Sequence, residues 1–480
     1  MQSVAEALDR LRALAAAEPL ATLASRFEAA GHELALVGGP VRDAFLGRPV
    51  NDLDLTTSAR PDDIIRIVAP VASAHWDIGR AFGTIGARMG ADTVEITTYR
   101  SDAYDPDSRK PEVAFGDTLD GDLERRDFTV NAMALRLPSL TLVDPSGGFD
   151  DLLAGRLRTP ISPERSFSDD PLRMLRAVRF AAQLGLDVDD ATLRAIAGMR
   201  DRLGIISAER VRDELVKLIS TSSPRRGLEL LVSTGLADLV LPELPALKLE
   251  VDEHAHHKDV YEHSLTVLDQ AIELEASRGA GPNAHPDVVL RLAALLHDIG
   301  KPATKKVEPG GAVTFHHHDV VGAKLARKRL TALRFDKETI VAVSRLIELH
   351  LRFFGYSDAP WTDSGVRRYV RDADALLERL HILTRADVTT RNRRKAARLR
   401  GAYDELEARI AALAEQEELA AIRPDLDGEQ VMAILDVRPG PVVGEAYRFL
   451  LEMRLDEGPL GADEAERRLR VWWQERGDTS

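Results

Sequence analysis

Apolar spacing divides the chain into an N-terminal part that mixes strands with helices and a longer part that is helical. Residues 3–30 place Ala and Leu at helical spacing, with a break at Pro19. Strands are predicted at 34–37, where four apolar residues follow one another, and at 93–97, where apolar and polar residues alternate. From about residue 159 amphipathic helical patterns dominate. The pattern predicts an α/β domain followed by all-α domains.

The turn after the first strand combines features that suit phosphate binding. Gly38 and Gly39 are adjacent, and a short helix is predicted to begin at Pro40 or Val41. Glycines let the backbone approach a ligand closely, and the unpaired N–H groups of a helix start attract a phosphate. Arg42 would add a positive charge. A lone Gly-Gly pair is usually only a turn, so the next strand matters.

That next strand is predicted to carry two carboxylates. Asp52 and Asp54 are two residues apart, so both side chains leave the same face of a strand. Paired carboxylates beside a phosphate site suggest two divalent ions that clamp the oxygens of a phosphoryl transfer. Glu95, on the later strand, is a candidate third carboxylate, although an exposed strand glutamate is equally common.

A second polar cluster lies between 122 and 135. Arg125 and Arg126 are followed by Asp127 and Asn131, which brings guanidinium groups, an acceptor and an amide to one turn and helix start. Such groups suit phosphate binding. A charged helix cap would explain the Arg-Asp pair equally well.

A helix is predicted within 166–184, with Ser168 or Asp169 as its cap and Pro171 in its first turn. Asp170 and Arg173 would lie one turn apart on one face, offering an acceptor beside a two-pronged donor. These groups can read the edge of a nucleobase. A surface salt bridge is the alternative interpretation. Arg176 and Arg179 continue the stripe and could hold phosphate or RNA.

Histidines are concentrated in the C-terminal half, on or beside apolar helical patterns. Imidazole and carboxylate groups from separate helices can converge on a divalent metal in a helical bundle. A single helical histidine is more often a core or surface residue, so the argument depends on the whole set. The candidate ligands are His263, His297, Asp298, His318, His350 and Asp387. His254, His256 and His257 lack the helical pattern and are left out.

Composition restricts the class of protein. The 480 residues are enough for three or four domains, and 44% hydrophobic with 30% charged residues is typical of a soluble globular chain. Without cysteine, disulfides and thiolate ligands are excluded. The net charge of −14 argues against a surface that coats nucleic acid indiscriminately, yet residues 385–400 carry seven positive charges and one negative. No signal peptide or membrane-spanning run is found, so a cytoplasmic location is expected.

Two motifs carry a family resemblance. The order L-V-G-G-x-V-R-D, then D-x-D, and the later R-R-D-F-T-x-N-A resemble the head of class II nucleotidyltransferases, which include bacterial tRNA CCA-adding enzymes and poly(A) polymerases. The resemblance implies that Asp52 and Asp54 hold two Mg²⁺ ions, with Glu95 at the E-x-T-T-x-R position. It also implies that residues 101–118 form a flexible loop that helps to change nucleotide choice.

The same resemblance implies a nucleotide pocket. The residues that it places around the triphosphate and sugar are Gly38, Gly39, Arg42, Asp43, Arg126, Asp127 and Asn131. The family's E-D-x-x-R motif selects CTP and ATP, which assigns base reading to Asp170 and Arg173. This chain has Asp169 where the family usually has Glu.

The histidine pattern resembles the HD phosphohydrolase superfamily. The resemblance implies that His263, His297, Asp298 and Asp387 bind one divalent metal of unknown identity, and that His318 and His350 hold a second. Lys301 would contact substrate phosphate. The expected activity is hydrolysis of phosphomonoesters or 2′,3′-cyclic phosphates.

These inferences predict a nucleotidyltransferase head at 1–158, a helical neck at 159–248, an HD domain at 249–400 and a helical tail after 401. The predicted reaction adds C, C and A to the 3′ end of tRNA from CTP and ATP, with the tail contacting the tRNA elbow. Alternatives are a poly(A) polymerase, a CC-only or A-only enzyme, a metal-dependent HD phosphohydrolase with a degenerate head, and a non-catalytic RNA-binding protein. The sequence does not determine the oligomeric state.

Overall fold

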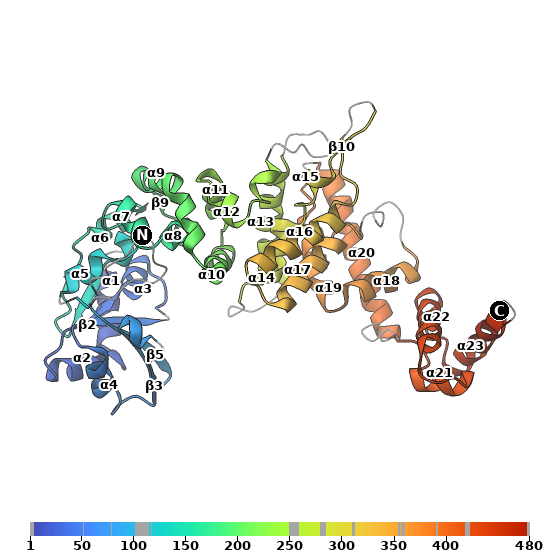
Figure 1. Ribbon diagram of the computed structural model, residues 1–480, viewed down its shortest axis with the longest axis horizontal. Coiled ribbons are helices and arrows are strands. Elements are labelled where there is room, and N and C mark those ends of the chain that lie inside the picture. The colour runs from blue at the N-terminus through green and yellow to red at the C-terminus, as the bar shows by residue number, and fades with distance from the viewer. Residues whose placement is uncertain are drawn as a thin grey trace. The chain divides into compact units, whose positions relative to one another are not determined.

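The chain forms two compact units, Met1–Pro242 and Glu243–Ser480. The computed structural model describes residues 4–50, 52–77, 79–100, 115–116, 118–248, 259–278, 285–309, 313–353, 356, 361–389, 392–417 and 423–477. Most of the loop predicted at 101–118 lies outside these ranges. Strands gather in the N-terminal part of the chain, coloured blue to cyan in Figure 1, and the rest is mainly helical. A mixed-sheet head followed by helical regions is therefore confirmed.

The first unit is built around a mixed sheet of order β3-β4-β5-β2-β1-β6-β7. Its strands are β1 (Leu34–Val37), β2 (Leu53–Thr57), β3 (Ala74–Trp76), β4 (Thr84–Met89), β5 (Asp92–Thr98), β6 (Ala134–Leu137) and β7 (Leu142–Val143). β2 and β5 run parallel, and the other neighbouring pairs are antiparallel. All four residues of β1 are buried, as expected of a continuous apolar strand covered on both faces.

Helices pack on this sheet and then continue beyond it. They are α1 (Val4–Ala16), α2 (Leu20–Ala29), α3 (Gly39–Leu46), α4 (Pro61–Val68), α5 (Leu119–Glu124), α6 (Gly148–Leu153), α7 (Pro163–Asp169), α8 (Leu172–Leu184), α9 (Asp190–Met199), α10 (Ala208–Ile219), α11 (Arg225–Ser233) and α12 (Ala237–Val240). The short elements are η1 (Arg80–Phe82), η2 (Thr129–Asn131), η3 (Arg200–Ile205) and the paired strands β8 (Arg156–Leu157) and β9 (Asp187–Val188). The start of α10 is capped by Ser207, whose side chain accepts the Arg210 N–H.

The strand at 34–37 and the helix break at Pro19 are confirmed, and the strand predicted at 93–97 lies within β5. A helix within 166–184 is confirmed, but α8 begins only at Leu172, and the predicted caps Ser168 and Asp169 lie in the separate helix α7. Asp170 has extended backbone angles, φ −143° and ψ 101°. A residue that precedes proline is disfavoured in the α region, and Pro171 follows, so the helix stops there. Asp52 also differs slightly, since it lies just before β2 rather than in it.

The second unit is helical. Its helices are α13 (Val260–Arg278), α14 (Val288–Leu296), α15 (Lys301–Thr304), α16 (His318–Ala332), α17 (Lys337–Leu349), α18 (Asp363–Ala373), α19 (Leu377–Ala386), α20 (Arg393–Glu417), α21 (Gly428–Leu435), α22 (Pro441–Glu457) and α23 (Ala462–Gly477), with η4 (Pro245–Leu247), η5 (Asp374–Leu376) and the strands β10 (Lys306–Val307) and β11 (Val313–Thr314). Within the described ranges, no helix has the length and apolarity needed to cross a membrane.

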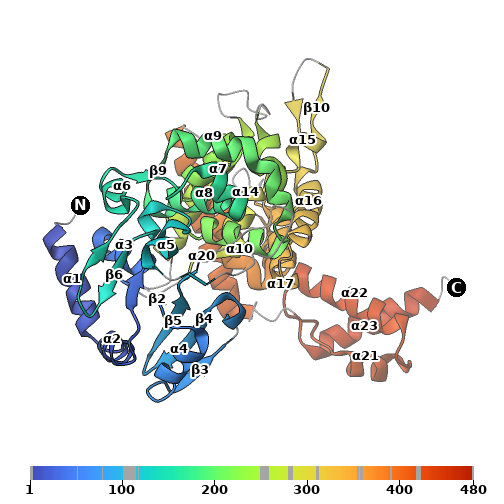
Figure 2. The ribbon, with the colours of Figure 1, turned by 60° about the vertical axis from the view of Figure 1, so that its left-hand side comes forward.

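The last three helices, α21 to α23, share a small apolar core and lie together in the red part of Figure 2. Val431, Leu450 and Leu469 are each almost fully buried there. The sequence predicts tight turns between helices at Gly428, Gly440 and Gly444. Gly440 does precede α22, but Gly428 begins α21 and Gly444 lies within α22, so the prediction is wrong at those two positions.

Candidate functional sites

The paired strands β2 and β5 bring two predicted carboxylates together. The strands are in parallel register with Asp54 opposite Glu95. Asp54 is half-buried, and Asp52 precedes the strand and is exposed. Leu53 and Leu55 are buried, as expected if they face away from the carboxylates. The backbone therefore places the three predicted carboxylates at one edge of the strand pair.

Charge around Asp54 suits a divalent cation. Burial raises the pKa of Asp54, and the nearby carboxylates of Glu95 and Asp52 raise it further. Arg126 and Arg42 lower that pKa but do not offset the increase. Clustered carboxylates that resist ionisation together gain most from a bound metal, because the ion removes their mutual repulsion. The donor set fits the divalent ions predicted for this position.

The glycine turn lies directly beside a predicted nucleotide-binding arginine. Gly38 has φ +75°, a region that favours glycine. A Cβ at Gly38 would lie 3.2 Å from Nη1 of Arg126 and 3.6 Å from the carbonyl oxygen of Asn131. Gly39 is the first residue of α3. The turn therefore leaves room for a close approach at the point where a helix start and the Arg126 guanidinium meet.

Arg42 is buried, and its side chain forms hydrogen bonds within this turn and to the segment that follows α5. Its Nη1 donates to Oδ1 of Asn131 at 2.5 Å, and its Nε and Nη2 donate to the two carboxylate oxygens of Asp43 at 2.9 and 3.0 Å. The guanidinium is thus held by both partners. Arg42, Asp43 and Asn131 are brought together as the resemblance implies, and their contact with a triphosphate stays a prediction.

Asp127 joins this group to α8. Its Oδ1 accepts the Asn131 amide at 3.0 Å, and its Oδ2 accepts Nε and Nη2 of Arg176, on α8, at 2.8 and 2.5 Å. Burial alone would raise the pKa of Asp127, but Arg176 and the Asn131 hydrogen bond together hold it well below its usual range. The Asp127 carboxylate therefore stays ionised, as a buried anion between α8 and the glycine turn.

Asp170 and Arg173 do not pair with each other in the described contacts. Asp170 accepts the backbone N–H of Leu172 and Nη2 of Arg210, each at 3.0 Å. Arg173 is buried and donates to Oγ of Ser166 at 2.8 Å and to the carbonyl oxygen of Arg125 at 2.6 Å. Each side chain is oriented separately, and their joint role in base reading stays a prediction.

Two buried carboxylates that sequence reasoning missed orient the arginines. Asp122 accepts Arg125 at 2.6 Å and Arg126 at 3.4 Å, and it also accepts Oγ1 of Thr56 on β2 at 3.1 Å. Glu214 on α10 accepts Nε of Arg179 at 2.6 Å. The spacing of Asp122 from the arginines, three and four residues, was a usable signal.

Arg179, predicted to hold phosphate or RNA, has its guanidinium turned to other partners in the interior. Its Nη1 donates to the Gln183 side chain at 2.6 Å, and the guanidinium lies 3.9 Å from the Phe180 ring centre. Together with Glu214 these contacts explain why α8 carries a buried arginine. A phosphate contact by Arg179 stays a prediction.

Replacing Arg176 by methionine is expected to destabilise the first unit. The change removes the fork that compensates the buried Asp127 carboxylate. Because the Arg176 side chain is 32% exposed, we expect the low end of the range for breaking a buried pair, about 3 kcal/mol in the free energy of unfolding. Hydrogen–deuterium exchange in urea, followed on peptides from α8 and the sheet, would measure it. Arg165→Met, on the exposed side of α7, is the control, and equal effects of the two changes would contradict the argument.

In the second unit, the six predicted metal ligands converge. Among the described residues they form two groups whose ligand atoms lie within 4.8 Å of one another: His263, His297 and Asp387, and Asp298, His318 and His350. Asp298 lies between the groups. Its Oδ2 is 3.3 Å from Nε2 of His297, and its Oδ1 is 3.3 Å from Nε2 of His318. The prediction placed Asp298 with the first metal, whereas the geometry lets one carboxylate serve both.

Hydrogen bonds fix which nitrogen of each histidine faces this centre. Nδ1 of His297, His318 and His350 lies 2.9, 2.8 and 2.6 Å from a backbone carbonyl oxygen three residues earlier. A carbonyl only accepts, so each Nδ1 carries the hydrogen and each Nε2 is free to bind a metal. His263 instead places Nδ1 3.1 Å from Oγ1 of Thr389, a partner that sequence reasoning missed.

The charges of the cluster also fit a metal. Burial lowers the pKa of His297, but the Asp298 and Asp387 carboxylates outweigh it and raise that pKa to about 10. Burial, together with the neighbouring His297, lowers the pKa of His350 to about 4. Oδ2 of Asp298 is buried and accepts no well-formed hydrogen bond from the described residues, although Nζ of Lys301 lies 2.9 Å away. A proton on His297 and the ammonium group of Lys301 balance the negative charge of the carboxylates. A divalent cation would supply the same positive charge between the ligand groups.

The basic segment predicted at 385–400 contains both ion-paired and exposed cations. Arg385 is bound to Glu407 and Asp404, each at 2.8 Å. In the described part of the segment, the exposed cations are Arg393, Arg394, Lys395, Arg398 and Arg400, all on α20. An RNA contact by these exposed residues stays a prediction.

Family comparisons cover most of the chain. The family described as "Poly A polymerase head domain" matches residues 34–158, and "Probable RNA and SrmB- binding site of polymerase A" matches residues 185–247. The family described as "HD domain" matches residues 260–392. The first match contains the carboxylates of β2 and β5, and the third contains all six ligands of the histidine centre.

Two curated relatives are similar over nearly their whole length. An A-adding tRNA nucleotidyltransferase of Deinococcus radiodurans is 37% identical over 92% of this chain and 95% of the relative. A CC-adding tRNA nucleotidyltransferase of Thermus thermophilus is 30% identical over 91% of this chain and 93% of the relative. A solved structure of a Bacillus stearothermophilus CCA-adding enzyme in complex with CTP has a TM-score of 0.67, with 24% identity, over 96% of this chain and 98% of that one. This last likeness supports the fold.

Proposed function

The chain belongs to the tRNA nucleotidyltransferase family, and we propose that it adds C, C and A to the 3′ end of tRNA from CTP and ATP. The observation that carries this proposal is the register of β2 and β5, which places Asp54 opposite Glu95, with Arg126 contributing to the charge around Asp54 and lying beside the glycine turn. Such a combination of clustered carboxylates and a phosphate cradle serves phosphoryl transfer. We also propose a cytoplasmic location, because the proposed substrate is tRNA.

We propose Mg²⁺ as the ion held by Asp52 and Asp54, with Glu95 supporting it. When bound, the ions would lower the pKa of the terminal tRNA hydroxyl and stabilise charge on the leaving pyrophosphate. Arg126 and the N–H groups at the start of α3 would bind the triphosphate. The hydrogen bonds of Asp122 to Arg126 and to Thr56 would hold that guanidinium against the strand that carries Asp54.

Addition of A alone is the second candidate. It is favoured by the 37% identity with the Deinococcus radiodurans A-adding enzyme over almost the full length of both chains. A CC-adding relative is also similar over the same extent, at 30% identity. The family membership thus leaves the number and kind of added nucleotides to be measured. A poly(A) polymerase shares the head and is a further outcome of the same assay.

Transcripts of tRNA that end before CCA, after CC, or after CCA would be incubated with the chain, Mg²⁺ and CTP, ATP or both, and their 3′ ends sequenced. Our proposal expects the first transcript to gain C, C and A and the complete transcript to gain nothing. Growth of only the CC-ended transcript, with ATP, would instead identify an A-adding enzyme. A long A tail on any RNA would identify a poly(A) polymerase. Either result would contradict CCA addition.

For the second unit we propose a metal-dependent phosphohydrolase that acts on phosphomonoesters or 2′,3′-cyclic phosphates. The paired ligand groups, with Asp298 between them, support the binding of two divalent ions, and such pairs of ions can hydrolyse a phosphate ester. Lys301, held by Asp298, is near enough to the centre to contact a substrate phosphate. Which metal is bound is part of the proposal to be measured, and the donor set of imidazoles and carboxylates suits a transition metal or magnesium.

A further inference from the structure

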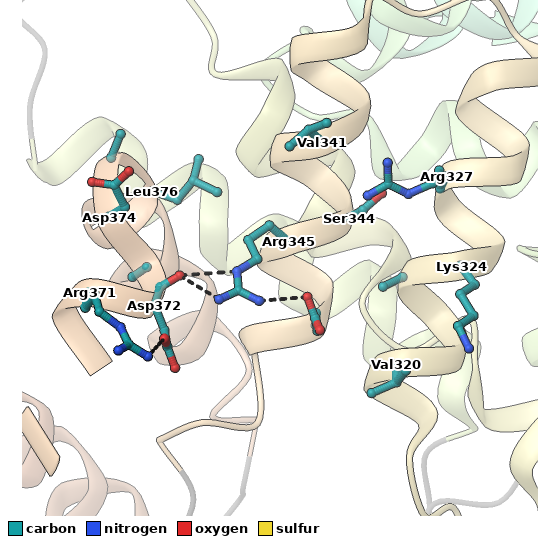
Figure 3. A pocket seen from close by; sticks show the side chains of 14 residues that line it. Val320, Lys324, Arg327, Val341, Ser344, Arg345, Arg371, Asp372, Asp374 and Leu376 are labelled. Carbon is teal, nitrogen blue, oxygen red and sulfur yellow. Dashed lines mark hydrogen bonds and ion pairs between the residues drawn. The ribbon is translucent and has the colours of Figure 1, made fainter. Parts of the chain in front are cut away.

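A hollow of about 600 Å³ opens on the second unit, and its lining residues do not include those of the histidine centre. Its walls are formed by α16, α17, the end of α18 and η5, as Figure 3 shows. The volume is in the range that small-molecule sites occupy. None of the metal ligands lines it, so its function requires a separate explanation.

The hollow lies on the faces of α16 and α17 that are turned away from the metal centre. At 3.6 residues per turn, Lys324 and Arg327 lie roughly 180–240° around α16 from the ligand His318. Val341 and Arg345 lie roughly 140–180° around α17 from His350. The two helices therefore separate the hollow from the histidine centre. A ligand in the hollow is not a substrate of that centre.

One wall of the hollow carries two positive charges that form no ion pair with the described residues. Lys324 and Arg327 are exposed and one turn apart on α16. In the described ranges neither has an ion pair, whereas the nearby Arg345 donates to Glu348 at 2.9 Å and to the Asp372 carbonyl oxygen at 3.0 Å. Two such cations one turn apart on the wall of a hollow favour an anion such as phosphate.

The opposite wall offers an acceptor, Arg345 lies between the two sides in Figure 3, and valines add apolar surface. In Figure 3, Lys324 and Arg327 are on one side, Asp372 and Asp374 on the other. The Asp372 carboxylate already accepts Arg352 and Arg371, but Asp374 is exposed and has no ion-pair partner in the part of the chain that is described. Apolar lining comes from residues including Val320 and Val341, which are 37% and 45% exposed.

We propose that this hollow binds a nucleoside phosphate. The phosphate would lie on Lys324 and Arg327, the base against the exposed valines, and a ribose hydroxyl or base amino group would donate to Asp374. An RNA backbone fits less well, because it needs a track of cations rather than one pair facing a bounded hollow. The site is independent of the nucleotide pocket proposed for the head, which lies in the other unit.

Calorimetric titration of the full chain in EDTA tests the proposal, since chelation removes metal-dependent binding at both other sites. AMP, CMP and inorganic phosphate are the probes. We expect the double variant Lys324→Glu/Arg327→Glu to weaken AMP or CMP binding at least about 10-fold, the effect of losing two charge-assisted contacts. The control Lys328→Glu/Lys337→Glu makes the same charge change on exposed residues of α16 and α17 outside the hollow, and it should bind as the unaltered chain does.

Equal affinities in the two double variants would overturn the proposal, and so would the absence of saturable nucleotide binding. Phosphate binding as tight as AMP and CMP binding would also overturn it, by showing a site for an anion alone. Nucleotide addition to tRNA would be measured in the same variants. Retained addition together with lost AMP or CMP binding would support a nucleotide site in the hollow that is separate from the head.

Discussion

The variant Asp54→Asn is expected to lose nucleotide addition to tRNA by at least about 1000-fold, which corresponds to about 4 kcal/mol of transition-state stabilisation. Asparagine keeps the shape of the side chain but removes the charge that a divalent ion needs at the point where β2 faces Glu95. Single-turnover addition of nucleotides to a tRNA transcript lacking its CCA end would measure the loss. Phosphohydrolase activity of the second unit should be unchanged.

The same variant should not weaken the fold, and this separates a catalytic role from a structural one. The pKa of Asp54 is raised in the folded chain, so above its unfolded pKa the charged carboxylate opposes folding. Without added metal, the neutral amide should therefore leave stability unchanged or raise it slightly at pH 7. Asp92→Asn, on the exposed start of β5, is the control and should retain addition. An inactive but destabilised Asp54→Asn chain would leave the catalytic assignment unsupported, and an active one would refute it.

Local patterns predicted the main features of the head because its chemistry is carried by short segments. The apolar run of β1 and the alternation within β5 predicted the strands. The spacing of Asp52 and Asp54 predicted that their side chains leave the same face. The start of α8 at Leu172 was also predictable in principle, since Asp170 precedes a proline and is therefore disfavoured in the α region. The prediction instead used Pro171 as a residue of the first helical turn, where proline is also common.

Partners far apart in sequence could not be predicted from spacing. Glu214 contacts Arg179 across 35 residues, and Asp127 contacts Arg176 across 49. These pairs depend on how α8 packs against α10 and the sheet, which apolar periodicity does not specify. The same limit applies to Asp298, whose position between two ligand groups follows from the packing of α14, α16 and α17. Residue types predicted a metal centre, but only the fold could show which ligands share an ion.

The variant His297→Ala is expected to lose phosphohydrolase activity by about 100-fold or more and to lose bound divalent metal. The Nε2 of His297 lies near carboxylates from both ligand groups, 3.3 Å from Asp298 and 3.6 Å from Asp387, so its removal affects the whole centre. Metal content by elemental mass spectrometry and hydrolysis of p-nitrophenyl phosphate and 2′,3′-cyclic AMP would measure the two losses. The neighbouring exposed histidine in His316→Ala provides a matched control that should keep both properties. Addition to tRNA should continue in His297→Ala because its carboxylates are in the other unit. Loss of addition in a folded variant would show that the two chemistries are coupled, and retained metal with full hydrolysis would exclude His297 as a ligand.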